Sequence, residues 1–128
     1  MAWELYDYVN RQGINEIAEW TLSLQKLQRK KLKAKLNMVM QAGTDLPPQL
    51  LAGTGTPHIY KLKVQGNPKL RPLLCKGPID NNIEFTLLIG AKEIQFGYEP
   101  ADALMKAMNN REEIIKEPSR RALHERID

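Results

Sequence analysis

The sequence predicts a fold of the α+β class, in which a small antiparallel sheet is packed by an N-terminal helical pair and a C-terminal helix. Three observations indicate this class. Apolar and polar residues alternate over 58–64, as they do in half-buried strands. Apolar residues recur at helical spacing within 15–42 and 100–118. Glycine, proline and asparagine gather between these segments, at 10–13, 66–68 and 77–82, which is typical of turns.

The first half of the chain predicts one strand and two helices. The aromatic, β-rich segment 3–9 has the length of an edge strand and ends at a turn containing Gly13. Asn15 is a good N-cap for a first helix, and Gly43 is a typical stop for a second. The apolar positions that define the two helices are Ile17, Trp20, Leu24, Leu32, Leu36, Val39 and Met40.

The second half predicts three antiparallel strands and a helix. Residues 44–57 are rich in Gly, Pro and Thr and predict a loop. The strand over 58–64 places Lys61 and Lys63 on the face opposite to its apolar residues. Residues 70–76 predict the next strand, although Pro72 cannot donate to a ladder, and 83–89 predicts the most apolar, central strand. Pro100 opens a helix that ends before Pro118.

Size and composition fit one domain over residues 1–128, in which 119–128 is a charged tail expected to be a short helix or frayed. A chain of 128 residues with 42% hydrophobic and 27% charged residues is ordinary for a globular protein. No apolar run approaches the roughly 20 residues that cross a bilayer, and no secretory signal is visible. The sequence therefore predicts a cytoplasmic protein that makes no membrane contact.

Cysteine and histidine are too few and too scattered for a metal motif. Cys75 is the single cysteine, which excludes an internal disulfide and predicts a small buried apolar side chain. His58 and His124 lie far apart in the chain, so no spacing typical of metal ligands occurs. We expect no metal and no cofactor, and we expect His58 to cap or pack at the start of its strand.

Positive charge is concentrated in the middle of the chain. Residues 26–76 hold eleven Lys and Arg against one acid, a net charge of +10, while 1–25 and 77–128 each carry −3. This asymmetry indicates a surface that binds a polyanion, with RNA the best candidate, and a partner that is acidic. The predicted RNA-binding residues of the second helix are Arg29, Lys30, Lys31, Lys33 and Lys35. As an isolated feature, such a run is more often a solvated helix face.

Several segments in order resemble the RelE/HigB toxin superfamily, above all its HigB-type branch with phage-derived relatives. The chain reads MVMQAGTDLPPQLLAGTGTPHIYKLKV where the family has a helix end, a glycine, a loop and a strand. KLRPLLC and FTLLIGAKEIQFGYEP are similar to the next two family strands, and PADALMKAMNNR is similar to its final helix. The resemblance covers nearly the whole chain and implies a RelE-like fold.

This resemblance implies the toxin of a type II toxin–antitoxin system, a metal-independent endoribonuclease that cleaves mRNA on translating ribosomes. The implied partners are mRNA, the ribosome and an acidic helix-turn-helix antitoxin of the HigA kind. In such toxins the ribose 2′-hydroxyl attacks the adjacent phosphate, which requires a base, cations for the phosphoryl charge and an acid. Two alternatives of the same fold are a ParE-like toxin that blocks DNA gyrase and a catalytically inactive RNA-binding module from a phage or mobile element.

The resemblance also implies site residues. Lys61, Lys63 and Arg71 match strand positions that hold phosphate, Lys92 matches the first of two paired lysines, and Tyr98 falls where a side chain stacks on a base or donates a proton. The sequence departs from the family at Glu93, where the second lysine is expected, at Pro72 and at Ala91. A carboxylate at 93 weakens anion binding but also offers a proton acceptor.

Structural roles compete with these functional ones. Lys61 and Lys63 are also typical of a solvent-facing strand, and Arg71 is also suited to a cross-strand ion pair with Glu84. Tyr98 and Trp20 are aromatic residues of the kind that most often pack against a core.

Overall fold

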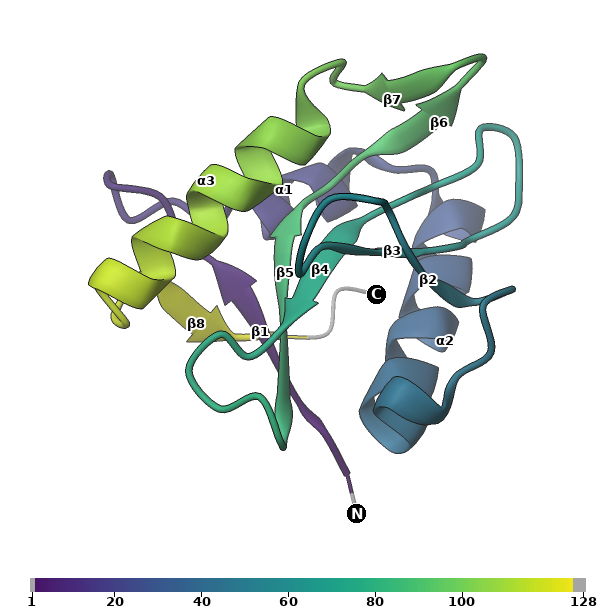
Figure 1. Ribbon diagram of the computed structural model, residues 1–128. Helices are drawn as coiled ribbons and strands as arrows, with labels where there is room; N and C mark the ends of the chain where they lie inside the picture. The colour runs from purple at the N-terminus through teal and green to yellow at the C-terminus, as the bar shows by residue number, and fades with distance from the viewer. Residues whose placement is uncertain (1, 126–128) are drawn as a thin grey trace.

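The computed structural model describes residues 2–125, which form a six-stranded mixed sheet, a two-stranded hairpin and three α-helices (Figure 1). The sheet strands are β1 (Glu4–Tyr8), β2 (Leu51–Gly53), β3 (Tyr60–Leu62), β4 (Leu73–Lys76), β5 (Glu84–Ile89) and β8 (Arg121–Leu123). The hairpin strands are β6 (Lys92–Ile94) and β7 (Gly97–Glu99), and the helices are α1 (Glu16–Ser23), α2 (Lys26–Ala42) and α3 (Ala103–Lys116). None of the described helices is long and apolar enough to cross a bilayer.

Helix α1 begins and helix α2 ends where the sequence predicts. The Asn15 side chain accepts a hydrogen bond from the Ala18 N–H at 2.9 Å and so caps α1. Gly43 follows α2 with a φ of 50°, and a Cβ there would lie 2.2 Å from the Trp3 indole. Glycine is therefore required at this position both by the backbone conformation and by the space available.

The predicted fold class is wrong about the sheet and about the end of the chain. The strand order is β2-β3-β4-β5-β1-β8, and β1 runs parallel to β5 with Leu5 opposite Phe85. The sheet is therefore mixed and larger than a small antiparallel one, and β1 lies inside it, not at the edge. Helix α3 is not the last element of the described residues, because β8 follows it and pairs antiparallel with β1. The element order is accordingly strand, two helices, strands, helix and strand.

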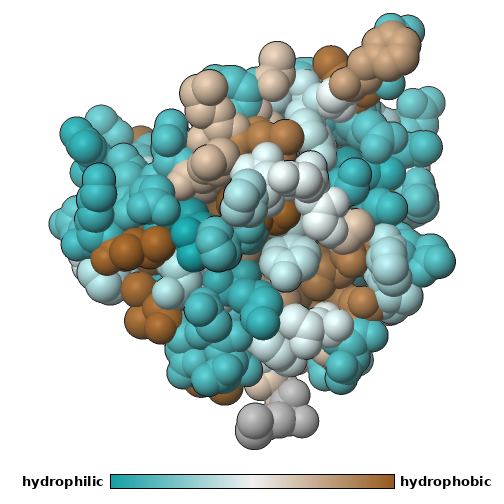
Figure 2. Space-filling model, viewed as in Figure 1, coloured by the Kyte–Doolittle hydropathy of each residue, from teal (hydrophilic) through white to brown (hydrophobic). Residues whose placement is uncertain are grey.

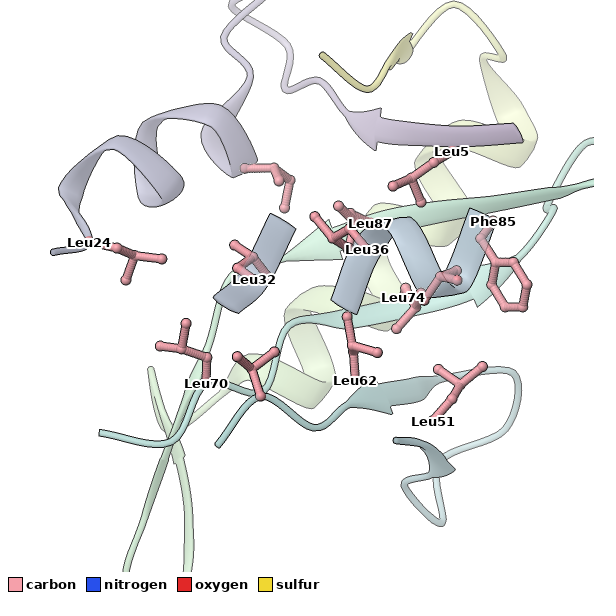
Figure 3. Packing of buried hydrophobic residues seen from close by; sticks show 13 residues of the cluster. Leu5, Leu24, Leu32, Leu36, Leu51, Leu62, Leu70, Leu74, Phe85 and Leu87 are labelled. Carbon is pink, nitrogen blue, oxygen red and sulfur yellow. The ribbon is translucent and has the colours of Figure 1, made fainter. Parts of the chain in front are cut away.

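The sheet is packed on both faces. Helix α3 lies on one side of the central strands, at the left of Figure 1, and α2 lies on the other, at the right. On the α2 face, Leu32 and Leu36 contact a cluster that includes Leu62, Leu74 and Leu87 (Figure 3). On the α3 face, a second cluster joins strand and helix residues: Tyr8, Ile59, Leu73, Cys75, Leu88, Ala91, Ala103, Ala107 and Ile114. Burying each large apolar side chain contributes about 1.5–3 kcal/mol, so both layers stabilise the sheet.

The segment predicted as a loop, 44–57, contains a short strand. Residues Leu51–Gly53 form β2, which pairs antiparallel with β3 and so becomes the edge of the sheet. The strand predicted over 70–76 is regular only from Leu73, because Pro72 cannot donate a ladder hydrogen bond. The prediction that 83–89 forms the central, most apolar strand is confirmed, because β5 lies between β4 and β1 with all but its last residue buried.

Buried carboxylates hold β8 against the sheet. Glu84 is buried and accepts a hydrogen bond from the Arg121 guanidinium. Asp7 is also buried and contacts the His124 Nδ1 and the Asn15 Nδ2, each at 2.9 Å. The alternative in which Glu84 pairs with Arg71 is therefore wrong, and the C-terminal tail is a strand over 121–123, with 126–128 outside the described residues.

Candidate nucleic-acid interface

The β3–β4 ribbon places three of the predicted site residues on one face of the sheet. Tyr60 lies opposite Leu74, Lys61 opposite Leu73, and Val64 opposite Leu70. The same register sets Lys63 opposite Arg71, and directly opposed residues of an antiparallel pair share a face. Leu73 packs against α3, so Lys61, Lys63 and Arg71 all lie on the α3 face of the sheet.

Arg71 is buried, with 4% of its surface exposed, and its guanidinium is engaged within the protein. Its Nε donates to the Glu93 carboxylate at 3.2 Å, and its Nη1 donates to the Leu70 carbonyl at 2.8 Å. A planar guanidinium held at several points is rigid, and it fixes the acceptor that it contacts. Arg71 therefore positions the Glu93 carboxylate at the surface and does not itself reach far into solvent.

The β6–β7 hairpin adds a carboxylate and a phenol to the same face. Glu93 lies directly opposite Tyr98 across the hairpin, so the two side chains share a face with Arg71. The Lys69 Nζ lies 3.8 Å from a Glu93 carboxylate oxygen. Burial, followed by the nearby Glu93 carboxylate, raises the pKa of Tyr98, while Arg71 opposes this shift. The Tyr98 hydroxyl therefore keeps its proton at neutral pH.

These residues form what we call the strand-face cluster: Lys61, Lys63, Lys69, Arg71, Glu93 and Tyr98. It holds four cations and one carboxylate, which gives it a formal net charge of +3. Lys61 and Lys63 are half-buried, and neither makes an ion pair within residues 2–125. Their charges are therefore available to an anionic ligand. Sequence reasoning did not single out Lys69, although its position two residues before Arg71 on a strand-like segment predicts the same face.

Among the five residues predicted from the resemblance for catalysis, Lys92 is the one that lies outside the cluster. Lys92 forms an antiparallel β-bridge with Leu70 and lies opposite Glu99 in the hairpin. Leu70 belongs to the apolar cluster on the α2 face, so Lys92 shares that face and Glu93, the next residue, takes the other. The structure thus brings Lys61, Lys63, Arg71 and Tyr98 together and separates Lys92 from them.

The basic residues of α2 form a second surface on the opposite side of the sheet. Arg29 has a structural contact, because its Nη1 donates to the Leu24 carbonyl at 2.9 Å and so caps the end of α1. Lys30 and Lys31 are exposed, whereas Lys33 and Lys35 are half-buried. Helix α2 packs on the face away from α3, but the Lys31 Nζ would lie 3.7 Å from a Cβ at Gly66, in the turn between Lys63 and Lys69.

The hairpin next to the strand-face cluster presents exposed apolar side chains. Phe96 at its tip is fully exposed, and Ile94 is 48% exposed. In α3, which follows the hairpin, Met105 is 65% exposed. Figure 2 shows hydrophobic colour on the projection at the upper right, where Figure 1 places the hairpin. Aromatic side chains beside cations are the combination on which single-stranded nucleic acids stack and bind.

No group of three or more His, Cys, Asp or Glu side chains that could hold a metal ion occurs in the part of the chain that the structure describes. Comparison of the chain with protein-family models, with curated proteins and with solved structures gives no match. The class of ligand is therefore inferred from the charges and geometry of the protein itself.

Proposed function

We propose that the protein binds single-stranded RNA across the strand-face cluster and cleaves it without a metal ion. The observation that carries this proposal is the convergence of Lys61, Lys63, Arg71, Glu93 and Tyr98 on one face beside an exposed aromatic residue. Lysines supply mobile charges for phosphates, and Phe96 supplies a surface on which a base stacks. A carboxylate can serve as a general base and a phenol as a general acid in RNA cleavage, while cations stabilise the phosphoryl charge.

In this mechanism each residue has one task. The Glu93 carboxylate, held by Arg71 and Lys69, accepts the proton of the ribose 2′-hydroxyl as that oxygen attacks the adjacent phosphorus. Lys61 and Lys63 stabilise the charge that grows on the phosphoryl oxygens. The neutral Tyr98 hydroxyl donates its proton to the departing 5′-oxygen, which leaves a 2′,3′-cyclic phosphate and a new 5′-hydroxyl end.

Binding is tested by the salt dependence of affinity for a short single-stranded RNA. If Lys61, Lys63 and Lys69 each contact one phosphate, the logarithm of the association constant falls with the logarithm of salt concentration with a slope of about −2. Lys63→Gln should lower affinity and reduce the steepness of this slope by about 0.7. Lys92→Gln is the matched control, because Lys92 lies on the other face of the sheet. An equal effect of the two substitutions would contradict this interface.

Cleavage is tested with labelled RNA in the presence of a chelator. Glu93→Gln should lower the cleavage rate by about 100-fold or more, the lower end of the range for loss of a general base, without weakening binding. Because Gln cannot accept the proton but fills the same space, retained affinity separates catalysis from binding. Cleavage that stops when chelator is added would refute the metal-independent mechanism.

The biological role that we propose is the toxin of a type II toxin–antitoxin system that acts on mRNA at the ribosome. The support is the resemblance of the sequence together with the cationic surface, which an acidic antitoxin would neutralise. Expression should arrest growth, Glu93→Gln should relieve the arrest, and co-expression with an acidic neighbouring gene product should yield a stable complex. Arrest with gyrase inhibition and no new RNA ends would favour a gyrase-blocking toxin instead.

A non-catalytic RNA-binding module is the second candidate, and the burial of Arg71 favours it. With 4% of its surface exposed, Arg71 offers less stabilisation to a developing phosphoryl charge than an accessible arginine would. Salt-dependent binding without any cleavage, unchanged by Glu93→Gln, is the result that this candidate predicts.

A further inference from the structure

A separate pocket lies where β4 ends and the 77–82 turn begins. It has a volume of about 170 Å³ and is lined by His58, Tyr60, Lys76, Asn81 and Arg111. These residues come from the loop before β3, from β3, from the end of β4, from the turn and from α3. None of them belongs to the strand-face cluster. A site needs about 10–15 Å³ to hold one water, so this pocket has room for a group several times larger.

The lining of the pocket is cationic and rich in hydrogen-bond donors. Lys76 and Arg111 supply two positive charges, and the Asn81 amide and the His58 ring add further polar atoms. No carboxylate lines the pocket. Glu112, an exposed residue of the same helix, contacts the Arg111 Nη1 at 3.4 Å, where solvent screens the pair. Asp80 belongs to the same turn as Asn81, and the Glu84 carboxylate accepts from the Ile79 N–H of that turn, but neither acid is among the lining residues.

The Arg111 side chain is largely buried, but one of its hydrogen-bond donors has no acceptor among the described residues. Its side chain is 16% exposed, and its Nε is buried without a hydrogen-bond partner in the described structure. The Arg111 charge opposes the rise that burial causes in the pKa of the Cys75 thiol, which lies in the cluster beneath α3. A buried donor without an acceptor is destabilising, and an anion bound in the pocket offers acceptors to the guanidinium.

His58 is held in a conformation that favours glycine. Its φ of 68° is the one positive φ among the non-glycine residues that the structure describes. The loop around it is fixed by threonine contacts: the Thr54 hydroxyl donates to the Ile59 carbonyl at 2.9 Å and accepts from the Thr56 N–H at 3.2 Å. Backbone strain of this kind is concentrated at functional sites. The loop therefore presents the imidazole at the pocket at a cost in stability.

We propose that this pocket binds a phosphate group, such as the terminal phosphate of a nucleotide or oligonucleotide. Two cations without a facing carboxylate match the two charges of a phosphate monoester, and the guanidinium fork matches its oxygens. The pocket shares no residue with the strand-face cluster, so phosphate binding here goes beyond the proposed RNA cleavage and does not depend on it.

The proposal is tested by NMR titration of the intact protein, monitored at the histidine ring resonances and at constant ionic strength. The probes are inorganic phosphate, adenosine 5′-monophosphate, and a short RNA with and without a 5′-phosphate. Saturable shifts of the His58 ring with a phosphate-bearing probe, and none with adenosine, support the proposal. Equal affinity for inorganic phosphate and the nucleotide identifies phosphate itself as the ligand, whereas at least tenfold tighter binding of 5′-phosphorylated RNA identifies an RNA end.

Variants decide whether the lining residues are responsible. Lys76→Gln and Arg111→Lys should each weaken phosphate binding at least tenfold, whereas Lys106→Gln, on the exposed side of α3, should leave it unchanged. His58→Gly removes the ring while its backbone keeps the same φ at less cost, so affinity should fall while the midpoint of urea unfolding stays equal or rises.

Different experimental results would refute the proposed phosphate site and the proposed cleavage at the strand-face cluster. Phosphate should still bind to the Glu93→Gln variant, because this substitution affects only the proposed RNA cleavage. Absence of saturable shifts with every phosphate-bearing probe, or affinity that Lys76→Gln and His58→Gly leave unchanged, would overturn the phosphate site whatever the outcome of the cleavage assay.

Discussion

Substitution of Gly90 by alanine should destabilise the protein through a clash with one aromatic ring. Gly90 is buried, and a Cβ built on it would lie 2.1 Å from the Trp20 Cδ2 and 2.3 Å from its Cγ. Carbon atoms in contact lie about 3.5–4.0 Å apart, so the indole must move by more than about 1 Å. Trp20 packs against the α2-face core, so its displacement disturbs that packing. Overpacking of this kind costs about 1–3 kcal/mol of unfolding free energy.

Urea unfolding followed by far-UV circular dichroism measures this cost. The matched control is Gly53→Ala, because a Cβ at Gly53 meets nothing within 4 Å and its φ is not positive. We expect this control to change stability by less than about 0.5 kcal/mol. Trp20→Leu removes the opposing ring, so Gly90→Ala should cost much less in that background. If Gly90→Ala lowered the unfolding free energy equally with and without Trp20, the close approach to the indole would not be responsible. The same conclusion would follow if Gly90→Ala and Gly53→Ala were equally destabilising.

Three further predictions concern buried groups. Burial raises the pKa of the Cys75 thiol to about 12, so Ellman's reagent should label it only on unfolding. Rapid labelling of the native protein would contradict this burial. Because the thiol of the unfolded chain loses its proton at lower pH than the buried thiol, the contribution of Cys75 to stability is complete below about pH 9 and declines as pH rises toward 12. Arg121→Gln leaves the Glu84 carboxylate buried without its cation and should cost about 3–5 kcal/mol in urea unfolding, most of which a second change, Glu84→Gln, should restore. Leu62→Ala should cost about 2–5 kcal/mol, whereas Leu22→Ala, at a position 61% exposed, should stay within about 0.5 kcal/mol, and similar values for both would contradict the assigned core.

The sequence predicted those elements whose boundaries depend on neighbouring residues. Asn15 and Gly43 mark helix ends because capping is a contact within one turn. The parallel pairing of β1 with β5 could not be predicted, since no local pattern records which strand lies beside which. Strand β8 escaped prediction for another reason: its exposed residues show no apolar alternation, and contacts such as Arg121 with Glu84 hold it in place.

The part of the candidate site that was predictable is the part determined by the alternation of side chains between the two faces of a strand. Lys61 and Lys63 share a face with Arg71 because each strand places every second residue on the same side. The burial of Arg71 was not visible, because its partner Glu93 lies on a hairpin twenty-two residues further on. The proposed phosphate pocket was also hidden, since its lining residues meet only when β3, the end of β4, the 77–82 turn and the middle of α3 come together. Lys92 was assigned by resemblance alone, and the strand register places it on the other face.

The interior position of β1 has a consequence for synthesis on the ribosome. β1 emerges first, but its two neighbours are β5, about 80 residues later, and β8, which ends the described sheet. At about 5–20 residues per second, roughly 4 to 16 seconds pass before the parallel partner is made. During this interval the unpaired N–H and C=O groups of β1 are a template for pairing with other chains. Nascent chains halted between β1 and β5 should therefore bind holdase chaperones and aggregate, and release should begin only once β5 has left the exit tunnel.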